Sequence, residues 1–529
     1  MAYNKKVLIA LFGLSMFFTG ASGLINEYIL STVSTYILGN SIEQFSITIA
    51  LMLGFMGVGG ALQKYINDDN LLLKFVLLEI LLSLLGGMTP IAVYSAHTFI
   101  PNHFALIQYF FISSIGFLIG FEIPFIIRIS QKYTQKLNTS LSIVLGADYI
   151  GSFVGALVWV YLLLPFIPIY KISFIVSGVN LFVGYITYLY ARKIEHTKEW
   201  LINIMFIIAT TILLVGYFNS EKINKYLEQK LYEDPIVEEF NTKYQHIILT
   251  HNVQLNDYRL YINGNTQFSS LDEKRYHELL VHPAMSMVNK PENILVIGGG
   301  DGFAVREIKK YSSVKNITLI DLDPDMVKFS QNNKIMKELN KSAFDDIEII
   351  NPDWITPGQL TRTKDKKTVN VINIDADKML WNLKEKFDVI IIDLPDPSSI
   401  ELAKLYSKEF FLKLKKVMKP TTVGSIQSTS PYHAKESFLC IGNTIEASGL
   451  KTMPYQYNIP SFGQWGWWLF GNIQDKVNIE VETDFLTSEV FESAKVFGKG
   501  ELQSKEVVIN TLMFPKLFHI YANNSWLRY

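Results

Sequence analysis

Hydrophobic residues dominate the first 218 positions of the 529-residue chain and form long, almost uninterrupted runs. A helix needs roughly 20 apolar residues to cross the hydrocarbon core of a bilayer. The runs that are long enough, each predicting one transmembrane helix, lie near 7–25, 45–62, 73–95, 103–127, 141–165, 170–191 and 200–218. The pattern therefore predicts a multi-pass α-helical membrane domain over residues 1–218, with the lipid bilayer as its environment.

The first run follows Lys5 and Lys6, so it also has the form of a secretory signal peptide. Further apolar runs come directly behind it, which favours a helix retained in the membrane. The glycine pairs Gly59–Gly60 and Gly86–Gly87 lie within later runs and are suited to close approach of neighbouring helices.

Acidic residues lie inside these runs or at their edges: Glu27, Glu79, Glu122 and Asp148. A carboxylate in hydrocarbon costs on the order of several kcal/mol, so we expect each to face the bundle interior or water. Two interpretations stay open. The acids form a site or path that attracts cations, or they lie at the interface and hydrogen-bond between helices. Glu122 and Asp148 are deepest and stand beside Gly or Pro.

Lysines and arginines indicate an orientation that the sequence does not settle. They gather before the first run and in loops near 64–74, 128–136 and 192–198, all on one side of a seven-helix topology. The positive-inside rule then puts the N-terminus in the cytoplasm and the C-terminal region outside. Either this is the orientation, or one run does not cross. The expected location is the cell (inner) membrane, with the side of the C-terminal region open.

From about residue 235 the pattern changes to short apolar segments that alternate with polar, helix-like segments. Residues 294–300 are predicted to form a buried strand that enters a glycine turn, and 303–311 the following helix. The next strand ends at Asp321, 19 positions after Gly302. A strand, a glycine turn, a helix and an acid at this distance are typical of a Rossmann-like domain in which the acid binds a ribose diol.

Acidic residues follow successive strands of this region: Asp301, Asp321, Asp375 and Asp393, with Asp396 close by. Because the carboxyl ends of parallel strands meet at one edge of a sheet, we expect these side chains at a single crevice. Any one of them could instead cap a helix or stabilise a turn. The series as a whole favours a binding site.

The composition changes along with the pattern. Residues 1–218 contain 11 Lys and Arg and 9 Asp and Glu, whereas the remainder contains 37 and 40. The net charge of −1 argues against a partner such as nucleic acid, which is bound through a basic excess. The single cysteine, Cys440, excludes an intramolecular disulfide and a cysteine-rich zinc site.

The clustered carboxylates need positively charged partners, because mutual repulsion otherwise raises their pKa values until some are protonated. The sequence has no His/Asp spacing typical of a metal site, so we expect no metal. A polycationic substrate is the simplest partner.

The segments GGGDG, DLDP, DAD and IIIDLPDP closely resemble the spermidine synthases, or polyamine aminopropyltransferases. Upstream YQHIIL and YHELLVHPAM, and downstream LYSKEFF, IQSTSP and NIPSFGQWGW, fit the same pattern, so the resemblance covers about 240–472. DLPDP and PSFGQWGW, together with GFEIP and ADYIG in the apolar region, resemble the long, membrane-fused bacterial form.

The resemblance implies a Rossmann-like α/β parallel-sheet domain of the S-adenosylmethionine methyltransferase type, preceded by a small β region. The expected boundaries are 1–218 for the membrane domain, 219–289 for a linker and the β region, 290–475 for the catalytic domain and 476–529 for a C-terminal extension. The extension carries no recognisable chemistry and is expected to pack on the catalytic domain or lie at the membrane surface. Soluble members of the family dimerise, so a homodimer is expected from the resemblance alone.

The implied reaction moves the aminopropyl group of decarboxylated S-adenosylmethionine to putrescine or a related amine, giving spermidine and methylthioadenosine. The donor is a co-substrate, and no bound cofactor is expected. An alkylamine is mostly protonated at neutral pH, and removing that proton costs about 4–5 kcal/mol. A carboxylate held at the amine can accept the proton and orient the lone pair.

Motif matching assigns Asp393 as the catalytic base. The donor would be bound by Asp301 at its ammonium group, Asp321 at its ribose, Asp375 and Ala376 at its adenine edge, and Gln245. The polyamine would be bound by Tyr276, His277, Asp301 and Asp396. For three of these an alternative stays open: Gln245 as a strand-edge polar residue, Tyr276 as a core residue and His277 as a surface histidine.

The sequence departs from the short soluble enzymes at three places. Phe303 stands where they have a second glycine after GGGDG, Phe462 replaces the tyrosine of their PTY motif, and Leu394–Pro395 replaces a Ser-Ser pair beside the base. Both phenylalanines predict a tighter or more apolar acceptor end. The acceptor amine is therefore open.

Two other functions stay open. One is a methyltransferase of the same fold that uses S-adenosylmethionine, which the position of Asp301 argues against. The other is a polyamine transporter or sensor whose C-terminal domain binds without turnover. In a combined form, the membrane part passes or senses the polyamines that the catalytic part makes.

Overall fold

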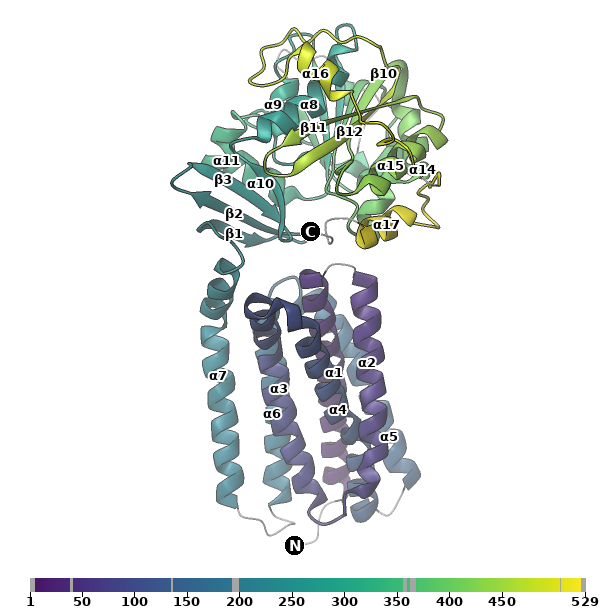
Figure 1. Cartoon of the computed structure of the whole chain (residues 1–529). Helices are drawn as coiled ribbons and strands as arrows, with labels where there is room; N and C mark the ends of the chain where they lie inside the picture. The colour runs from purple at the N-terminus through teal and green to yellow at the C-terminus, as the bar shows by residue number, and fades with distance from the viewer. Residues whose placement is uncertain are drawn as a thin grey trace. The chain divides into compact units, whose positions relative to one another are not determined.

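The computed structural model describes residues 5–38, 41–134, 137–192, 199–354, 359–361, 368–504 and 506–524. The chain divides into two compact units, Met1–Glu233 and Asp234–Tyr529 (Figure 1). Part of the basic loop expected near 192–198, and Lys136 in the loop before it, lie outside the described residues.

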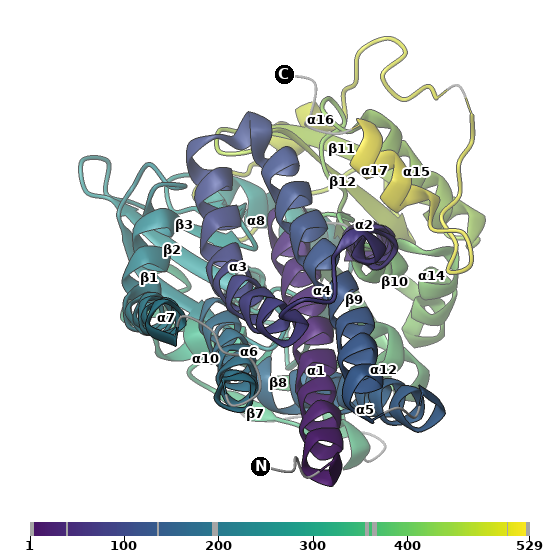
Figure 2. The same cartoon turned by 90° about the horizontal axis from the view of Figure 1, so that it is seen from below.

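The first unit is helical. Its helices are α1 (Lys5–Leu38), α2 (Ser41–Leu62), α3 (Leu71–Phe99), α4 (Phe104–Thr134), α5 (Leu137–Val158), α6 (Ile169–Ala191) and α7 (Glu199–Gln229). Helix α1 packs against each of α2–α6 and runs through the middle of the bundle, while α7 packs on α3 and α6 (Figure 2). Helix α7 continues well past the apolar run that predicted it, so residues 219–229 are helical.

Among the described residues, six helices are long and apolar enough to cross a membrane. They correspond to the runs expected from 45–62 onward. The first expected span, 7–25, lies within α1, whose first side chains fall outside the described residues. Six apolar helices are therefore present, and membrane insertion stays a prediction.

Glycines set the closest helix contacts in this unit. A Cβ at Gly116 or Gly120 of α4 would lie 2.6 or 2.2 Å from a backbone oxygen of α2, and one at Gly151 of α5 would lie 2.0 Å from the Phe17 oxygen of α1. Gly59 of the predicted pair meets the Phe117 oxygen in the same way, at 2.2 Å. Such close backbone approach is typical of small-residue packing between apolar helices.

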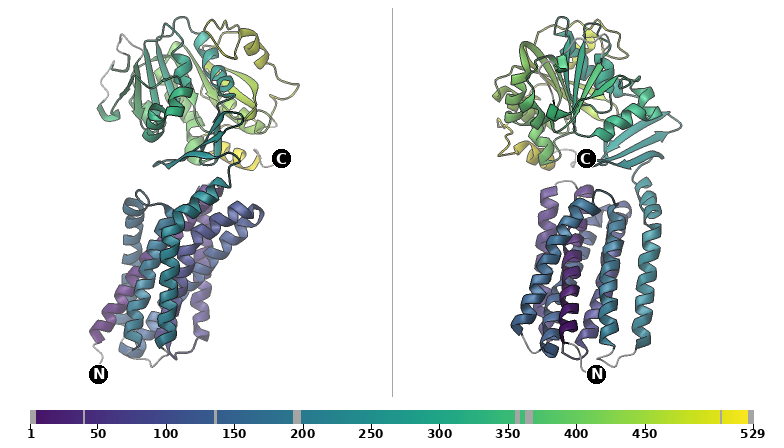
Figure 3. Two further views of the ribbon diagram at one scale, coloured as in Figure 1. Left: turned by 90° about the vertical axis from the view of Figure 1, so that its left-hand side faces the viewer. Right: turned by 180° about the vertical axis from the view of Figure 1, so that it is seen from behind.

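The second unit begins with a four-stranded antiparallel sheet in the order β1-β2-β3-β4. Its strands are β1 (Ile236–Asn241), β2 (His246–Asn252), β3 (Asp257–Ile262) and β4 (Asn265–Ser269), and α8 (Glu273–Ser286) follows. Figure 3 shows this small sheet beside the main one.

The main sheet has eight strands in the order β11-β12-β10-β9-β5-β6-β8-β7. They are β5 (Asn293–Gly298), β6 (Asn316–Asp321), β7 (Ile347–Ile349), β8 (Thr368–Asn373), β9 (Phe387–Asp393), β10 (Met418–Gln427), β11 (Thr452–Ile459) and β12 (Gly463–Gly471). Strands β5–β10 pair in parallel, and β11 and β12 pair antiparallel. Strand β5 pairs with β6 on one side and β9 on the other, so the strand order reverses at β5. Ligands of open parallel sheets bind beyond the strand ends at such a point.

The central strands β5 and β9 are mostly apolar and buried because helices cover both faces of the sheet. Along β5, Val296 packs into one core cluster, and Leu295 and Ile297 pack into the other. The remaining helices are α9 (Phe303–Ile308), α10 (Pro324–Asn332), α11 (Lys334–Leu339), α12 (Ala376–Asn382), α13 (Ile400–Ala403), α14 (Lys408–Leu414), α15 (Lys435–Ala447), α16 (Ser488–Ala494) and α17 (Lys516–Asn524).

The C-terminal extension packs on this unit through its described residues. Leu517 of α17 is fully buried in the second core cluster, and the Asn510 amide donates to the Ala403 carbonyl at 2.7 Å. Of the two positions expected for the extension, the structure shows packing on the α/β domain. Tyr521 of α17 is thereby brought to the sheet edge where the acids gather.

Candidate active site

The glycine turn after β5 lies directly against the end of β9. Gly298 has φ +78°, and a Cβ there would lie 2.0 Å from the Asp393 carbonyl oxygen. The Gly299 amide donates to the same carbonyl at 3.1 Å. Only glycine combines this backbone conformation with this clearance. The turn therefore brings the ends of β5 and β9 together at the base of the crevice.

Asp321 ends β6 and lies against the same turn. A Cβ at Gly300 would lie 2.7 Å from Asp321 Oδ2, so the carboxylate and the glycine backbone are in contact. Burial raises the pKa of Asp321 to about 7, although the Asp323 backbone amide donates to its Oδ1 at 2.8 Å and opposes the shift. No cationic side chain of the described residues pairs with this carboxylate, so a ligand with hydroxyl donors would satisfy it.

Tyr276, His277 and Glu273 stand on α8, three and four positions apart, and therefore share one helix face. The Tyr276 hydroxyl donates to Asp393 Oδ1 at 2.8 Å. The His277 Nε2 atom lies 3.8 Å from Asp393 Oδ2 and 4.0 Å from Asp301 Oδ2. Thus α8, the glycine turn and β9 each supply side chains to one cluster.

The geometry fixes the protonation of His277. Its Nδ1 donates to the Glu273 carbonyl at 2.8 Å and to Glu273 Oε2 at 3.0 Å, while Nε2 faces two carboxylates. Burial alone would lower the pKa of the ring, but the Glu273 hydrogen bond and the surrounding negative charges outweigh it and raise the pKa to about 9. At neutral pH the side chain is an imidazolium.

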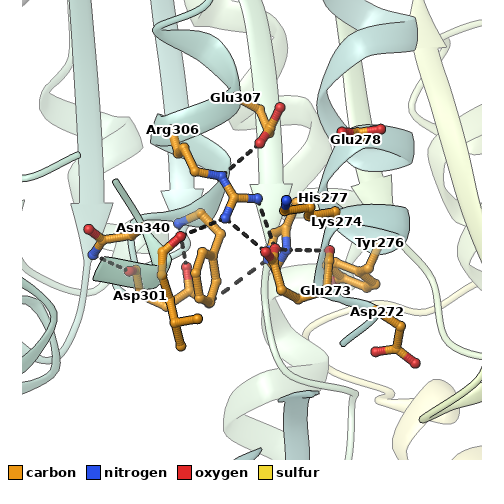
Figure 4. A network of polar contacts seen from close by, with 12 residues as sticks. Asp272, Glu273, Lys274, Tyr276, His277, Glu278, Asp301, Arg306, Glu307 and Asn340 are labelled. Atoms are coloured by element: carbon orange, nitrogen blue, oxygen red, sulfur yellow. Dashed lines mark hydrogen bonds and ion pairs between the residues drawn. The ribbon is translucent and has the colours of Figure 1, made fainter. Parts of the chain in front are cut away.

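Behind His277 lies a buried ion network (Figure 4). Arg306 of α9 donates to both oxygens of Glu273 at 2.8 Å and to Glu307 Oε1 at 2.7 Å. Glu307 also contacts His282 Nε2 at 3.0 Å and Lys310 at 2.6 Å. Arg306 therefore holds Glu273 in the position that orients His277.

The positive charge of His277 favours the ionised form of the neighbouring acids. Burial raises the pKa of Asp393 to about 6, and the Asp301 charge adds to this, while His277 and the Tyr276 hydrogen bond oppose it. Burial likewise raises the pKa of Asp301, against the His277 charge and its hydrogen bond from the Phe303 amide at 3.0 Å. Above about pH 6, Asp393 is therefore a carboxylate that can accept a proton.

His277, Asp301 and Asp393 offer three ligand atoms within 4.8 Å of one another, a geometry that a metal ion could use. A metal ion bound there would have to displace the proton of the His277 imidazolium, because a histidine ligand must be neutral. Without a metal, the imidazolium supplies the local positive charge.

Asp396 forms a second acidic position beyond β9. The Tyr521 hydroxyl donates to its Oδ2 at 2.7 Å, and Gln427 at the end of β10 donates to its Oδ1 at 3.3 Å. Burial raises the pKa of Asp396 to about 6, and both hydrogen bonds oppose the shift. Gln427 could have been identified from the sequence, because it lies at the end of a strand. Nothing in the sequence indicated Tyr521, because it lies 125 residues from Asp396 along the chain.

Asp375 and Ala376 lie at the start of α12, one strand further along the sheet. Asp375 accepts from the Asp377 amide at 2.9 Å, which makes it a helix cap, and pairs with Lys404 at 2.5 Å. Its carboxylate is therefore occupied, and Ala376 is buried beside it. Among the described residues, Asp375 is paired with a lysine, whereas Asp301 and Asp393 share the His277 imidazolium.

Gln245 lies in the turn between β1 and β2. The backbone N–H of Gln245 donates to the Thr242 hydroxyl at 3.0 Å, and that hydroxyl donates to Asp323 Oδ2 at 2.7 Å. The turn is thereby held against the loop that follows Asp321. Gln245 thus lies on the Asp321 side of the crevice.

The two phenylalanine departures occupy different places. Phe303 is fully buried and packs edge-to-face on Phe268 at 4.8 Å and near the His277 ring at 4.9 Å. It therefore supports His277 from behind, and the expectation that it narrows the open end is wrong. Phe462 packs on Trp465 at 5.1 Å and near Tyr276 at 6.0 Å, so it does lie beside the Asp393 cluster.

The comparisons with known proteins all indicate the same family. Residues 273–483 match the spermine/spermidine synthase domain. The polyamine aminopropyltransferase of Oceanobacillus iheyensis is 36% identical over 96% of this chain and 96% of its own length. The corresponding protein of Leptospira interrogans is 35% identical over 97% and 98%. Polyamine aminopropyltransferase 2 of Aquifex aeolicus is 36% identical over 96% and 97%. The similarity therefore includes the apolar N-terminal region.

The ion network predicts a stability effect. Arg306→Met leaves the buried carboxylates of Glu273 and Glu307 without their guanidinium, and removing one partner of a buried pair costs about 3 kcal/mol. We expect the free energy of unfolding to fall by about this amount. The measurement is urea unfolding of the full chain followed by tryptophan fluorescence.

The matched control is Lys315→Met, which removes an exposed ion pair with Glu292 at 2.6 Å. Exposed pairs contribute about 1 kcal/mol or less. An Arg306→Met loss no larger than that of the control would show that the network does not stabilise the fold.

Proposed function

The chain belongs to the polyamine aminopropyltransferase family, and we propose that it transfers the aminopropyl group at the crevice beyond β5, β6 and β9. The observation that carries this proposal is the cluster of Asp301, Asp393, Tyr276 and His277, whose carboxylates face an otherwise cation-poor opening. Decarboxylated S-adenosylmethionine is the co-substrate, and an amine such as putrescine is the acceptor.

The donor occupies the Asp321 side of the crevice. Asp321 accepts from the ribose hydroxyls, as its position against Gly300 allows. Gln245 and the start of α12, with Asp375 and Ala376, border this side. The Asp375 carboxylate is already paired with Lys404. Asp375 therefore contributes to adenine binding through its position and its backbone atoms rather than through the charge of its carboxylate.

Asp301 selects the decarboxylated donor. Its carboxylate lies 4.0 Å from the His277 Nε2 atom, which also lies 3.8 Å from Asp393. An aminopropyl ammonium is attracted there, whereas ordinary S-adenosylmethionine brings a carboxylate to the same place and is repelled. This charge selection supports aminopropyl transfer over methyl transfer.

The chemical step is a displacement at carbon. The acceptor nitrogen attacks the aminopropyl carbon bonded to sulfur, the C–S bond breaks, and its electron pair neutralises the sulfonium to give methylthioadenosine. The nitrogen loses one proton, which Asp393 accepts. Holding both partners in line removes much of the entropic barrier.

Burial makes Asp393 a better base than an exposed aspartate. The rise in its pKa from 3.8 to about 6 narrows the gap to an alkylammonium, since one unit is about 1.36 kcal/mol. Tyr276 holds the carboxylate through its Oδ1 atom, which leaves Oδ2 toward His277 and the acceptor.

Asp396 binds the far ammonium of the acceptor. The Tyr521 hydroxyl orients this carboxylate at 2.7 Å and supplies the tyrosine function that Phe462 lacks. The C-terminal extension is therefore part of the acceptor site.

We also propose that the helical unit crosses the cell membrane. The six apolar helices support this, as do large apolar side chains exposed on its surface, such as Phe110, Phe153 and Phe218. Helix α7 is the last helix before the α/β unit. The direction in which α7 crosses the membrane therefore decides on which side the α/β unit lies.

The base assignment predicts the effect of Asp393→Asn. The amide cannot accept the amine proton, so kcat falls by a factor of about 10²–10⁴ while donor binding is retained. The measurement is methylthioadenosine release, with donor affinity measured separately. The control Asp345→Asn removes an exposed acid on the same unit and leaves kcat unchanged. Wild-type turnover in Asp393→Asn would remove Asp393 from this role.

The His277 charge predicts a pH effect. The imidazolium stabilises the Asp393 carboxylate, so its loss in His277→Gln raises the pKa of Asp393 above about 6. The acid limb of the kcat/KM profile for the acceptor then moves to higher pH, by about one unit. His251→Gln, on the small sheet, should leave the limb in place. An unshifted or downward-shifted limb in His277→Gln contradicts the assigned charge.

The Tyr521 contact predicts a change limited to the acceptor. Tyr521→Phe removes one hydrogen bond to a carboxylate, so the KM for the acceptor rises roughly tenfold while the KM for the donor is unchanged. Adding Phe462→Tyr should recover part of the loss. Equal changes in both KM values, or none, would show that α17 does not form the acceptor site.

A further inference from the structure

The helical unit is apolar outside and polar inside. Its surface exposes large side chains such as Phe218, which is 73% exposed. Its interior contains Glu79, Glu122 and Asn180, which are 0, 2 and 1% exposed. Among the described buried residues of this unit, none is Lys, Arg or His. The interior therefore holds carboxyl and other polar groups without a basic counterpart among these residues.

Several of these interior groups have no hydrogen-bond partner in the described part of the chain. They are Glu79 Oε1 and Oε2, Glu122 Oε1, Asn180 Oδ1 and Nδ2, Asn26 Nδ2 and Ser177 Oγ. A buried polar atom without a partner is costly, and a buried carboxylate more so. If these residues only joined helices together, their side chains would be bonded to one another. The unpartnered atoms point to a ligand.

The residues converge along α3 and α6. A Cβ at Gly86 of α3 would lie 3.2 Å from Ser177 Oγ and 3.3 Å from Asn26 Oδ1, so α1 and α6 meet α3 at this glycine. Two helical turns earlier on α3, a Cβ at Gly184 of α6 would lie 3.0 Å from the Glu79 Cβ.

Asn180 connects these two contacts. It follows Ser177 by three positions and precedes Gly184 by four, which places it on the same face of α6. Glu122 of α4 is close enough to Glu79 for their negative charges to interact, and also to Asp148 of α5. We call Asn26, Glu79, Glu122, Ser177 and Asn180 the interior seam.

We propose that the interior seam binds an alkylammonium cation, with Glu79 and Glu122 as counter-charges and the Asn and Ser side chains as hydrogen-bond partners. Glu79 and Gly86 are seven residues apart, or about 10 Å along the helix. This length suits an extended amine with several N–H donors, whereas a Ca²⁺ ion needs 6–8 oxygen ligands around one point. The choice of a polyamine over an inorganic cation rests on the proposed function of the α/β unit.

The test counts spermidine sites on the full-length chain in detergent, with methylthioadenosine present to fill the donor side. Equilibrium dialysis with labelled spermidine should find two sites in the wild type, one in Glu79→Gln and one in Asp396→Asn. Excess Na⁺ should leave the Glu79-dependent site occupied. The control Glu43→Gln, an exposed acid at the start of α2, should retain both sites.

Methylthioadenosine release is measured in parallel to show that Glu79→Gln and Glu43→Gln are folded, and retention of the Glu79-dependent site shows that Asp396→Asn is folded. A second variant, Asn180→Leu, keeps both carboxylates and should weaken the Glu79-dependent site roughly tenfold with turnover unchanged. A single wild-type site that only Asp396→Asn removes would overturn the seam site and leave the proposed function standing. Displacement of spermidine from the Glu79-dependent site by Na⁺, or wild-type affinity in Asn180→Leu, would also overturn it.

Discussion

The hydrogen bond from His277 to Glu273 determines the charge balance of the whole crevice. It holds an imidazolium within about 4 Å of two carboxylates, Asp301 and Asp393. Without that charge the two acids would repel each other and one would take up a proton. The Arg306 network fixes Glu273 in turn, so the protonation of the proposed base depends on residues that no substrate touches.

The acidic cluster lies at the end of β5, where the strand order of the main sheet reverses. The glycine turn presses the ends of β5 and β9 together, and α8 brings Tyr276 and His277 to the same edge. Among the described residues, carboxylates gather at this edge and His277 is the cation that faces Asp301 and Asp393. The interior seam of the helical unit has a similar imbalance, since none of the described buried residues of that unit is basic. In both units, the proposed amine site therefore rests on acids that need a cationic partner.

The sequence predicts the elements that follow local rules. Apolar runs predict the helices of the first unit, and the spacing of Gly302 and Asp321 predicts the β5-turn-α9-β6 unit. The acids at strand ends were predictable because parallel strands share one carboxyl edge. Phe303 was misjudged, because its burial against Phe268 depends on a small sheet more than thirty residues upstream. The Lys404 partner of Asp375 and the Tyr521 partner of Asp396 depend on long-range packing that no local pattern records.

We expect the crevice to transfer an aminopropyl group rather than a methyl group, because Asp301 attracts an ammonium and repels a carboxylate. The most direct measurement incubates the purified full-length chain and putrescine with either decarboxylated or ordinary S-adenosylmethionine and quantifies all products. We expect equal amounts of methylthioadenosine and spermidine from the decarboxylated donor, and no product from the ordinary one. Methylated amine from ordinary S-adenosylmethionine, without methylthioadenosine from the decarboxylated donor, would show that the crevice transfers a methyl group instead.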